Sequence, residues 1–371
     1  MTWPGAGFPG DEEPYPGPPP TRRPERWEWA PEPWHPFPGP VPWGPPPPPP
    51  PVVRWAPPRG TPPHDVPRPY VLAMRSRDWA WWRPLLGLLL LGVVYAVAAT
   101  LVVLLTLATG VGPDFAQLDL VDPFTLLVTN VSLIVAIPVV WLAWVTAHGM
   151  RRGWSSSVLA RLRWRLVLPY SLMAVATVGA GIGLSVVAGF VLGDDEVTGP
   201  VASFGWLLLV VVLTTPLQSA AEEYLFRGYL SQAIAGWVRR PVAGAVIAGV
   251  VTAALFSAAH LPGDVPTFLD RFGFGLAASA VVWLTGGVEA AIVMHAVNNV
   301  LVFVLAGALG QGVATEEAPD AGGLLFLLVS LLSVAAYVAV VGRSRRRLHP
   351  ETRTAALDLR TPGVPVPVPA G

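Results

Sequence analysis

Eight stretches of mostly apolar residues, each about as long as a bilayer is thick, run through the chain from residue 85 onward. A helix rises 1.5 Å per residue, so roughly 20 apolar residues cross the ~30 Å hydrocarbon layer of a membrane. We therefore predict an all-α polytopic membrane protein with about eight transmembrane helices. The predicted spans are near Leu85–Thr109, Pro123–Ala147, Leu166–Leu192, Phe204–Leu230, Val242–His260, Phe268–Thr285, Val288–Ala308 and Leu324–Val341.

The connections between these spans alternate in charge, and this alternation predicts the topology. Arginine is retained on the cytoplasmic side of membrane proteins, so eight spans with both termini in the cytoplasm fit the sequence. The Ala-, Val-, Leu-, Gly- and Pro-rich composition indicates a bacterium, hence its plasma membrane. Arg271 is the exception and is expected inside the sixth helix. The basic connections hold Arg75, Arg77, Arg83, Arg151, Arg152, Arg161, Arg163, Arg165, Arg239, Arg240, Arg343, Arg345, Arg346 and Arg347; the acidic ones hold Asp114, Asp119, Asp122, Asp194, Asp195, Glu196, Glu316, Glu317 and Asp320.

Proline dominates the first part of the chain and separates it from the spans. Proline lacks a backbone donor and favours solvated polyproline II, so residues 1–78 are predicted to be a disordered, Pro- and Trp-rich cytoplasmic tail without a cleavable signal peptide. A partner with a groove for Pro-rich peptides is the functional alternative. Residues 79–345 form the predicted transmembrane domain, and residues 346–371 a short C-terminal tail. Ser155–Arg165 is predicted to be an interfacial helix.

Composition excludes several functions. The formal net charge is zero, which gives no support for nucleic acid as a partner. The chain has no cysteine, so disulfides, thiolate metal sites and cysteine nucleophiles are excluded together. The candidate active-site residues must therefore be carboxylates, histidines and amides.

The fourth predicted span carries two adjacent carboxylates, Glu222 and Glu223, followed by Arg227. A charge inside hydrocarbon costs about 2.5–3.5 kcal/mol on insertion scales, so such residues usually face the interior of a bundle and have a function. Glu223 and Arg227 are separated by one helical turn and are expected to pair. Glu222 points about 100° away and remains free to act as a base.

Two later spans carry polar residues that are expected to meet Glu222. Glu222 and His260 lie at equal sequence distance from Pro241, at the predicted turn, so an antiparallel hairpin places them at equal depth. His295 and Asn299 share one face of the seventh span. His295 lies only seven or eight residues from its own turn, however, which leaves a mismatch of about 17 Å unless helices tilt, kink or extend. Pro216 is a candidate for such a kink.

Each of these features has a structural alternative when it is taken alone. A single histidine in a span often bonds one helix to another, and neighbouring asparagines such as Asn298 and Asn299 can hold helices together. Intramembrane Glu, His and Arg are also typical of proton-coupled transporters, although the two halves show no inverted repeat. A non-catalytic membrane scaffold is the third alternative.

The three motifs together resemble the CPBP family of intramembrane proteases, which includes the CAAX prenyl endopeptidases and bacterial homologues. Glu222, Glu223 and Arg227 match the family's Glu-Glu-x-x-x-Arg; Phe256 and His260 match Phe-x-x-x-His; His295 and Asn299 match His-x-x-x-Asn. The Thr285-Gly286-Gly287 turn also looks like the family's. The resemblance covers roughly residues 165–310, which it marks as the catalytic core, and leaves out the tail and the first two spans.

What the resemblance implies is an endopeptidase that hydrolyses a peptide bond of a membrane-embedded or lipid-anchored polypeptide. Glu222 and His260 would activate water, His295 and Asn299 would stabilise the oxyanion, and Glu223 and Arg227 would support the site. The family has also been called metalloprotease, so zinc held by Glu222, His260 and His295 is the alternative. A metal-free mechanism is favoured, because asparagine is a poor zinc ligand and His-Glu-x-x-His is absent from the sequence.

Overall fold

The computed structural model describes residues 61–110, 119–192, 198–310 and 322–357, and these residues form helices joined by short connections. No strand is present among them; two isolated bridges, Pro69 to Arg353 and Ser157 to Gly287, are the only extended pairings described. Eight helical segments are long and apolar enough to cross a membrane, as predicted. The described part of the chain is therefore that of an all-α, multi-pass membrane protein.

Several spans are built from more than one helical element. The helical elements are η1 (Tyr70–Leu72), α1 (Arg83–Ala108), α2 (Pro123–Ile134), α3 (Ala136–His148), η2 (Arg152–Ser155), α4 (Trp164–Ala174), the π-turn η3 (Val175–Gly179), α5 (Ala180–Leu192), α6 (Phe204–Leu225), the π-turn η4 (Phe226–Leu230), α7 (Ser231–Val238), α8 (Pro241–Ala259), α9 (Val265–Thr285), α10 (Glu289–Leu309) and α11 (Gly322–Leu348). The pair α2–α3 forms the second span, α4–η3–α5 the third, and α6–η4–α7 the fourth. The fourth span is longer than predicted and ends at Val238.

Short polar signals in the sequence set the helix ends. Asp122 and Asp264 cap α2 and α9, accepting hydrogen bonds from the backbone of Thr125 and Thr267 at 2.8 and 2.7 Å. Proline follows each of these caps in the first turn, where its missing N–H is tolerated. Gly286 ends α9 with a φ of 72°, a left-handed conformation that suits glycine.

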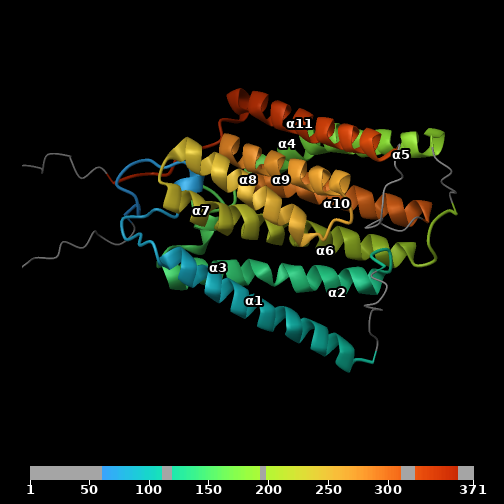
Figure 1. The fold of residues 1–371 in the computed structure, drawn as a ribbon, viewed down its shortest axis with the longest axis horizontal. Helices are drawn as coiled ribbons and strands as arrows, with labels where there is room; N and C mark the ends of the chain where they lie inside the picture. The colour runs from blue at the N-terminus through green and yellow to red at the C-terminus, as the bar shows by residue number, and fades with distance from the viewer. Residues whose placement is uncertain (1–60, 111–118, 193–197, 311–321, 358–371) are drawn as a thin grey trace, which may run out of the picture. The chain divides into compact units, whose positions relative to one another are not determined.

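The α6 helix lies at the centre of the packing, against α2, α3 and α10. In turn, α10 contacts α4 and α9, and α9 packs against α8 and α11 (Figure 1). The described ends of the chain, near residues 61 and 357, lie at the same end of this bundle (Figure 1). We call this end the terminal end. It also carries the arginine-rich connections, as the charge alternation predicts.

The predicted tail boundaries at residues 78 and 346 are wrong for the residues that the structure describes. Tyr70 and Leu72 are fully buried, and Val71 and Leu72 pack against Ala235 and Ala248. Helix α11 continues to Leu348, and the segment after it pairs with the N-terminal one. The backbone of Thr354 donates to Arg68 O at 2.8 Å and that of Leu357 to His64 O at 3.0 Å. Residues 61–82 and 349–357 therefore belong to the folded domain. Residues 1–60 and 358–371 lie outside the described residues.

The predicted interfacial helix Ser155–Arg165 is also wrong. The short helix η2 ends at Ser155, and a non-helical loop follows that is buried at Ser156, Ser157 and Val158. Its backbone is paired elsewhere: Val158 N donates to Gly286 O at 3.0 Å, and Val288 N donates to Ser156 O at 2.9 Å. The loop satisfies its polar groups against the turn between α9 and α10, so it enters the protein and does not lie on a membrane surface.

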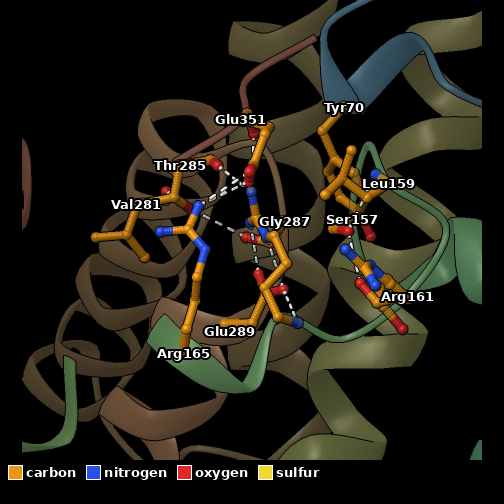
Figure 2. A network of polar contacts seen from close by, with 12 residues as sticks. Tyr70, Ser157, Leu159, Arg161, Arg165, Val281, Thr285, Gly287, Glu289 and Glu351 are labelled. Carbon is orange, nitrogen blue, oxygen red and sulfur yellow. Dashed lines mark hydrogen bonds and ion pairs between the residues drawn. The ribbon is translucent and has the colours of Figure 1, made fainter. Parts of the chain in front are cut away.

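A buried ion pair fixes this loop to the start of α10. Arg163 Nη2 lies 2.7 Å from Glu289 Oε2, with both side chains almost fully buried. The Arg163 guanidinium also donates to the carbonyls of Thr285 and Glu351 at 3.0 and 2.8 Å. Arg165 adds a pair with the Glu351 carboxylate at 3.0 Å (Figure 2). Loop, turn and C-terminal segment therefore meet at one point, directly before the helix that carries His295.

Candidate active site

The two carboxylates of the fourth span lie just before a local irregularity of the helix. Glu222 and Glu223 fall in the last turn of α6, and η4 follows with Arg227 inside it. A π-turn leaves backbone carbonyls open to other donors and is common at functional sites. Here the carbonyl of Gly228 accepts from Trp144 Nε1 at 3.2 Å and from Gln232 Nε2 at 3.3 Å. The sequence contains no proline at this position, only Gly228, and the π-turn was not predicted.

Glu223 forms the predicted ion pair with Arg227. Arg227 Nη1 lies 3.0 Å from Glu223 Oε1, and both side chains are fully buried. Arg227 Nη2 continues to the carbonyl of Gly275 in α9 at 2.8 Å. A second partner of Glu223 is His295, whose Nδ1 lies 3.0 Å from the same Oε1. Glu223 therefore joins α6, α9 and α10.

Glu222 has a different environment from its neighbour. Its Oε1 accepts a hydrogen bond from Gln218 Nε2, one turn earlier in α6, at 2.6 Å. Its Oε2 is buried and has no hydrogen-bond partner among the described residues. His295 Nε2 lies 3.6 Å from this Oε2. One oxygen of Glu222 is therefore held in place, and the other retains its capacity to accept a proton.

His260 follows the last residue of α8 and is the C-cap of that helix. Its Nδ1 bonds to the carbonyl of Phe256 at 2.7 Å, which leaves Nε2 for other contacts. Phe256 packs at its edge against His295, with ring centroids 5.6 Å apart. No hydrogen bond links His260 to Glu222 in the described part of the chain, but both side chains line one cavity.

Asn299 reaches Glu222 through Gln218. Its Nδ2 donates to Gln218 Oε1 at 3.3 Å, and its Oδ1 accepts from Asn298 Nδ2 at 3.1 Å. Gln218 is the residue that the motif analysis missed. Its position four residues before Glu222 in an apolar helix is the signal that was available in the sequence.

The four predicted catalytic residues line a single cavity of about 380 Å³. The walls come from more of the chain than the predicted core of residues 165–310. Asn130 of α2 and Ser330 of α11 contribute, and Asn130 is fixed by Thr214 and Thr215 of α6 at 2.8 and 3.1 Å. Three further polar residues that belong to none of the motifs also line the cavity: Asp270 and Arg271 of α9 and Asn298 of α10.

The expected difference in depth between Glu222 and His295 is resolved by helix length. From Glu222 to the end of α7 is 16 residues, about 24 Å; from the start of α10 to His295 is six residues, about 9 Å. Because the two side chains lie within 3.6 Å, α7 extends about 15 Å beyond the start of α10. There its end packs against residues 71 and 72. No kink at Pro216 is needed to explain the convergence.

Zinc held by Glu222, His260 and His295 is the alternative that the sequence leaves open. Among the described residues, no three His, Asp or Glu side chains are arranged to hold a metal ion. Nδ1 of His295 is bonded to Glu223 and Nδ1 of His260 to a backbone carbonyl, which leaves the Nε2 atom of each ring for a water or another ligand. The mechanism proposed below takes no step through a metal.

A carboxylate and two histidines surround one cavity inside the helical bundle. The chain therefore belongs to the class of polytopic membrane proteins that have a buried polar site. The comparisons with known proteins show which family this part of the chain is similar to. Residues 202–301 match the family of type II CAAX prenyl endopeptidase Rce1-like proteins. This segment contains all three motifs, so the comparison supports the resemblance to the CPBP family over these residues.

A bacterial protein is similar to a longer part of the chain. The uncharacterized protein YyaK of Bacillus subtilis is 27% identical over 202 residues, which is 50% of this chain and 63% of that protein. The chain therefore matches less than two thirds of the relative's length. No solved structure matches the chain.

Proposed function

We propose that this protein is an intramembrane endopeptidase that hydrolyses a peptide bond of a membrane-embedded or lipid-anchored polypeptide at Glu222. The observation that carries the proposal is the buried Oε2 of Glu222, which lacks a hydrogen bond among the described residues and lies in a cavity shared with His260 and Asn299. The family match supports protease function, because the matched description is that of an endopeptidase.

The geometry supports a general-base mechanism. Glu222 Oε2 takes a proton from water as the water oxygen attacks the scissile carbonyl carbon. His260, with Nδ1 occupied by Phe256 O, accepts a hydrogen bond from the same water at Nε2. When the tetrahedral intermediate collapses, the C–N bond breaks and Glu222 returns the proton to the leaving amine.

Two side chains are placed to stabilise the negative charge that develops on the carbonyl oxygen. Asn299 Nδ2 has a second N–H beyond the one given to Gln218. His295 Nε2, 3.6 Å from Glu222 Oε2, is the second donor whenever it carries a proton. Removing one such donor typically lowers the rate 10²–10³-fold.

The substrate is sought with the wild-type protein and a Glu222→Gln variant. The N- and C-termini of membrane proteins are compared by mass spectrometry in host cells that express either protein. We expect new termini with the wild type only. Asp65→Asn, which removes an exposed carboxylate far along the chain from the cavity motifs, is the control and should cleave normally.

A peptide from such a cleavage then tests the chemistry. Incubation with purified protein in isotopically labelled water should place the label in the new carboxyl group. Equal cleavage by Glu222→Gln would show that the assignment is wrong. If neither protein cleaves, but the wild type conducts protons in proteoliposomes, the transporter alternative replaces this proposal.

A further inference from the structure

A second, larger cavity of about 1210 Å³ lies between α3, α4, α6 and α10. It uses the opposite face of α6 from the catalytic cavity: Pro216, Leu217 and Ala220 line it, whereas Gln218 and Glu222 line the first. On α10 as well, the two cavities are lined by different faces of the helix. The lining of the larger cavity within the spans is almost wholly apolar, with aliphatic side chains from all four helices. We call this cavity the α4 groove.

The α4 groove has a basic mouth at the terminal end of the bundle. Arg151, Arg152 and Arg161 line it there, and all three are exposed. None of the three has an ion-pair partner among the described residues. Glu289 also lines the groove, but its carboxylate is already neutralised by Arg163. The mouth therefore carries uncompensated positive charge.

One buried donor in the wall points to a polar ligand near this mouth. Trp141 lines the groove, and its buried Nε1 has no acceptor in the described part of the chain. The Arg152 guanidinium stacks over the same indole, 4.6 Å from the ring centroid. A buried N–H normally finds an acceptor, and the ester carbonyl of a lipid is one that the membrane supplies.

The length of the α4 groove corresponds to one leaflet. Its lining on α10 runs from Glu289 to Leu301, which is about 18 Å of helix, and on α4–η3 from Trp164 to Val175, about 17 Å. Half of a ~30 Å hydrocarbon layer is about 15 Å. Acyl chains that start at the basic mouth would therefore end near the middle of the bilayer.

We propose that the α4 groove binds an anionic phospholipid, with the phosphate at Arg151, Arg152 and Arg161 and an acyl chain between α4 and the α6–α10 pair. Basic pockets between helices at the cytoplasmic side bind anionic headgroups by the same charge complementarity. This inference goes beyond the proposed proteolysis, and its test involves no cleavage.

The full-length protein in mild detergent is titrated with phosphatidylglycerol or with zwitterionic phosphatidylcholine, and bound lipid is counted by native mass spectrometry. We expect phosphatidylglycerol to bind with at least about tenfold higher affinity. Replacing Arg151, Arg152 and Arg161 together by glutamine should remove this preference. The matched control replaces Arg343, Arg345 and Arg346, three exposed arginines at the end of α11, and should retain it.

A second pair of variants tests the apolar part of the groove. Ser171→Trp fills the groove from α4 and should lower phosphatidylglycerol binding, whereas Leu168→Trp on the lipid-facing side of α4 should not. The proposal is overturned if both lipids bind equally, if the mouth and control variants behave alike, or if filling the groove has no effect. Recovery of a lipid-anchored polypeptide in the groove, competing with phosphatidylglycerol, would also overturn it.

Discussion

Nδ1 of His295 lies 3.0 Å from Oε1 of Glu223, so the first and third motifs meet directly inside the bundle. The same carboxylate oxygen holds Arg227, which makes one buried group the junction of α6, η4 and α10. The other ring nitrogen of His295, Nε2, lies 3.6 Å from Glu222 Oε2. One imidazole therefore lies between Glu223 and the proposed base, Glu222.

Removing Arg227 should destabilise the protein strongly. Arg227→Leu leaves the Glu223 carboxylate buried without its main counter-charge, and breaking a buried pair in this way costs about 3–5 kcal/mol. Replacing both partners by leucine should cost clearly less, because no buried charge remains. Thermal unfolding in detergent measures both. If the double variant is the less stable of the two, Glu223 and Arg227 do not act as a pair.

Gln218 should act as a positioning residue for Glu222. Gln218→Leu removes a 2.6 Å hydrogen bond to the carboxylate and the link to Asn299. Hydrogen bonds to charged groups contribute about 1.5–3 kcal/mol, so we expect kcat to fall about 10- to 100-fold with KM little changed. The control is Thr214→Val, one turn earlier on the same helix and bonded to Asn130. An equal loss of kcat in both variants would indicate a general effect on α6.

The sequence predicted those parts of the fold that depend on apolar length and helix periodicity. The eight spans follow from apolar length and the Glu223–Arg227 pair from spacing. The contact of His295 with Glu222 does not, because spacing predicted a mismatch in depth that only the extra length of α7 resolves. The sequence did not predict relations set by tertiary contacts. Residues 155–165 are polar enough for a membrane surface, yet pair their backbone with Gly286 and Val288. Gln218 belongs to none of the motifs, and its link between Glu222 and Asn299 is visible only in the structure.

The turn before α10 should tolerate no side chain at Gly287. An added Cβ would lie 2.4 Å from both Arg163 Nη2 and Glu289 Oε2, within the buried ion pair. Gly287→Ala should therefore lower stability by about 1–3 kcal/mol, as overpacking does. Gly92→Ala in α1 is the matched control, since a Cβ there meets nothing within 4 Å. It should be neutral or stabilising by up to about 1 kcal/mol. Similar unfolding midpoints for the two variants would contradict this description of the turn.

The C-terminal segment should detach in acid. Burial acts to raise the pKa of the Glu351 carboxyl, but its own backbone N–H and the charges of Arg165 and Arg163 outweigh this and hold the pKa below the usual 4.5. Because the pKa of Glu351 is lower in the folded than in the unfolded protein, its ionised carboxylate stabilises the folded state above pH 4.5. This stabilisation is lost as the pH falls through the pKa of the folded state. The protection factors of residues 349–357, which correct for the pH dependence of intrinsic amide exchange, should therefore fall below pH 4.5. In Glu351→Gln they should be low already at neutral pH, and protection factors that do not change with pH in the wild type would contradict the prediction.

Metal removal should leave activity unchanged. We expect cleavage to survive exhaustive chelation, because in the proposed mechanism the Glu222 carboxylate activates the water without a metal. The assay compares chelated protein before and after zinc is added back. Loss of cleavage on chelation with recovery on zinc would replace the metal-free mechanism.

The direction of α8 determines which compartment supplies the reacting water. The helix starts at Pro241 beside Arg239 and Arg240 and reaches His260 after 19 residues, about 28 Å, close to the thickness of the hydrocarbon layer. The start of α8 lies with the end of α7 about 15 Å beyond the start of α10, so His260 lies only about 13 Å past that start, inside the bundle. The cavity lining continues from His260 to Leu120, which precedes α2 at the end of the bundle opposite the terminal end. If the arginine-rich end faces the cytoplasm, as the charge of the connections predicts, water reaches the site along this cavity from outside the cell.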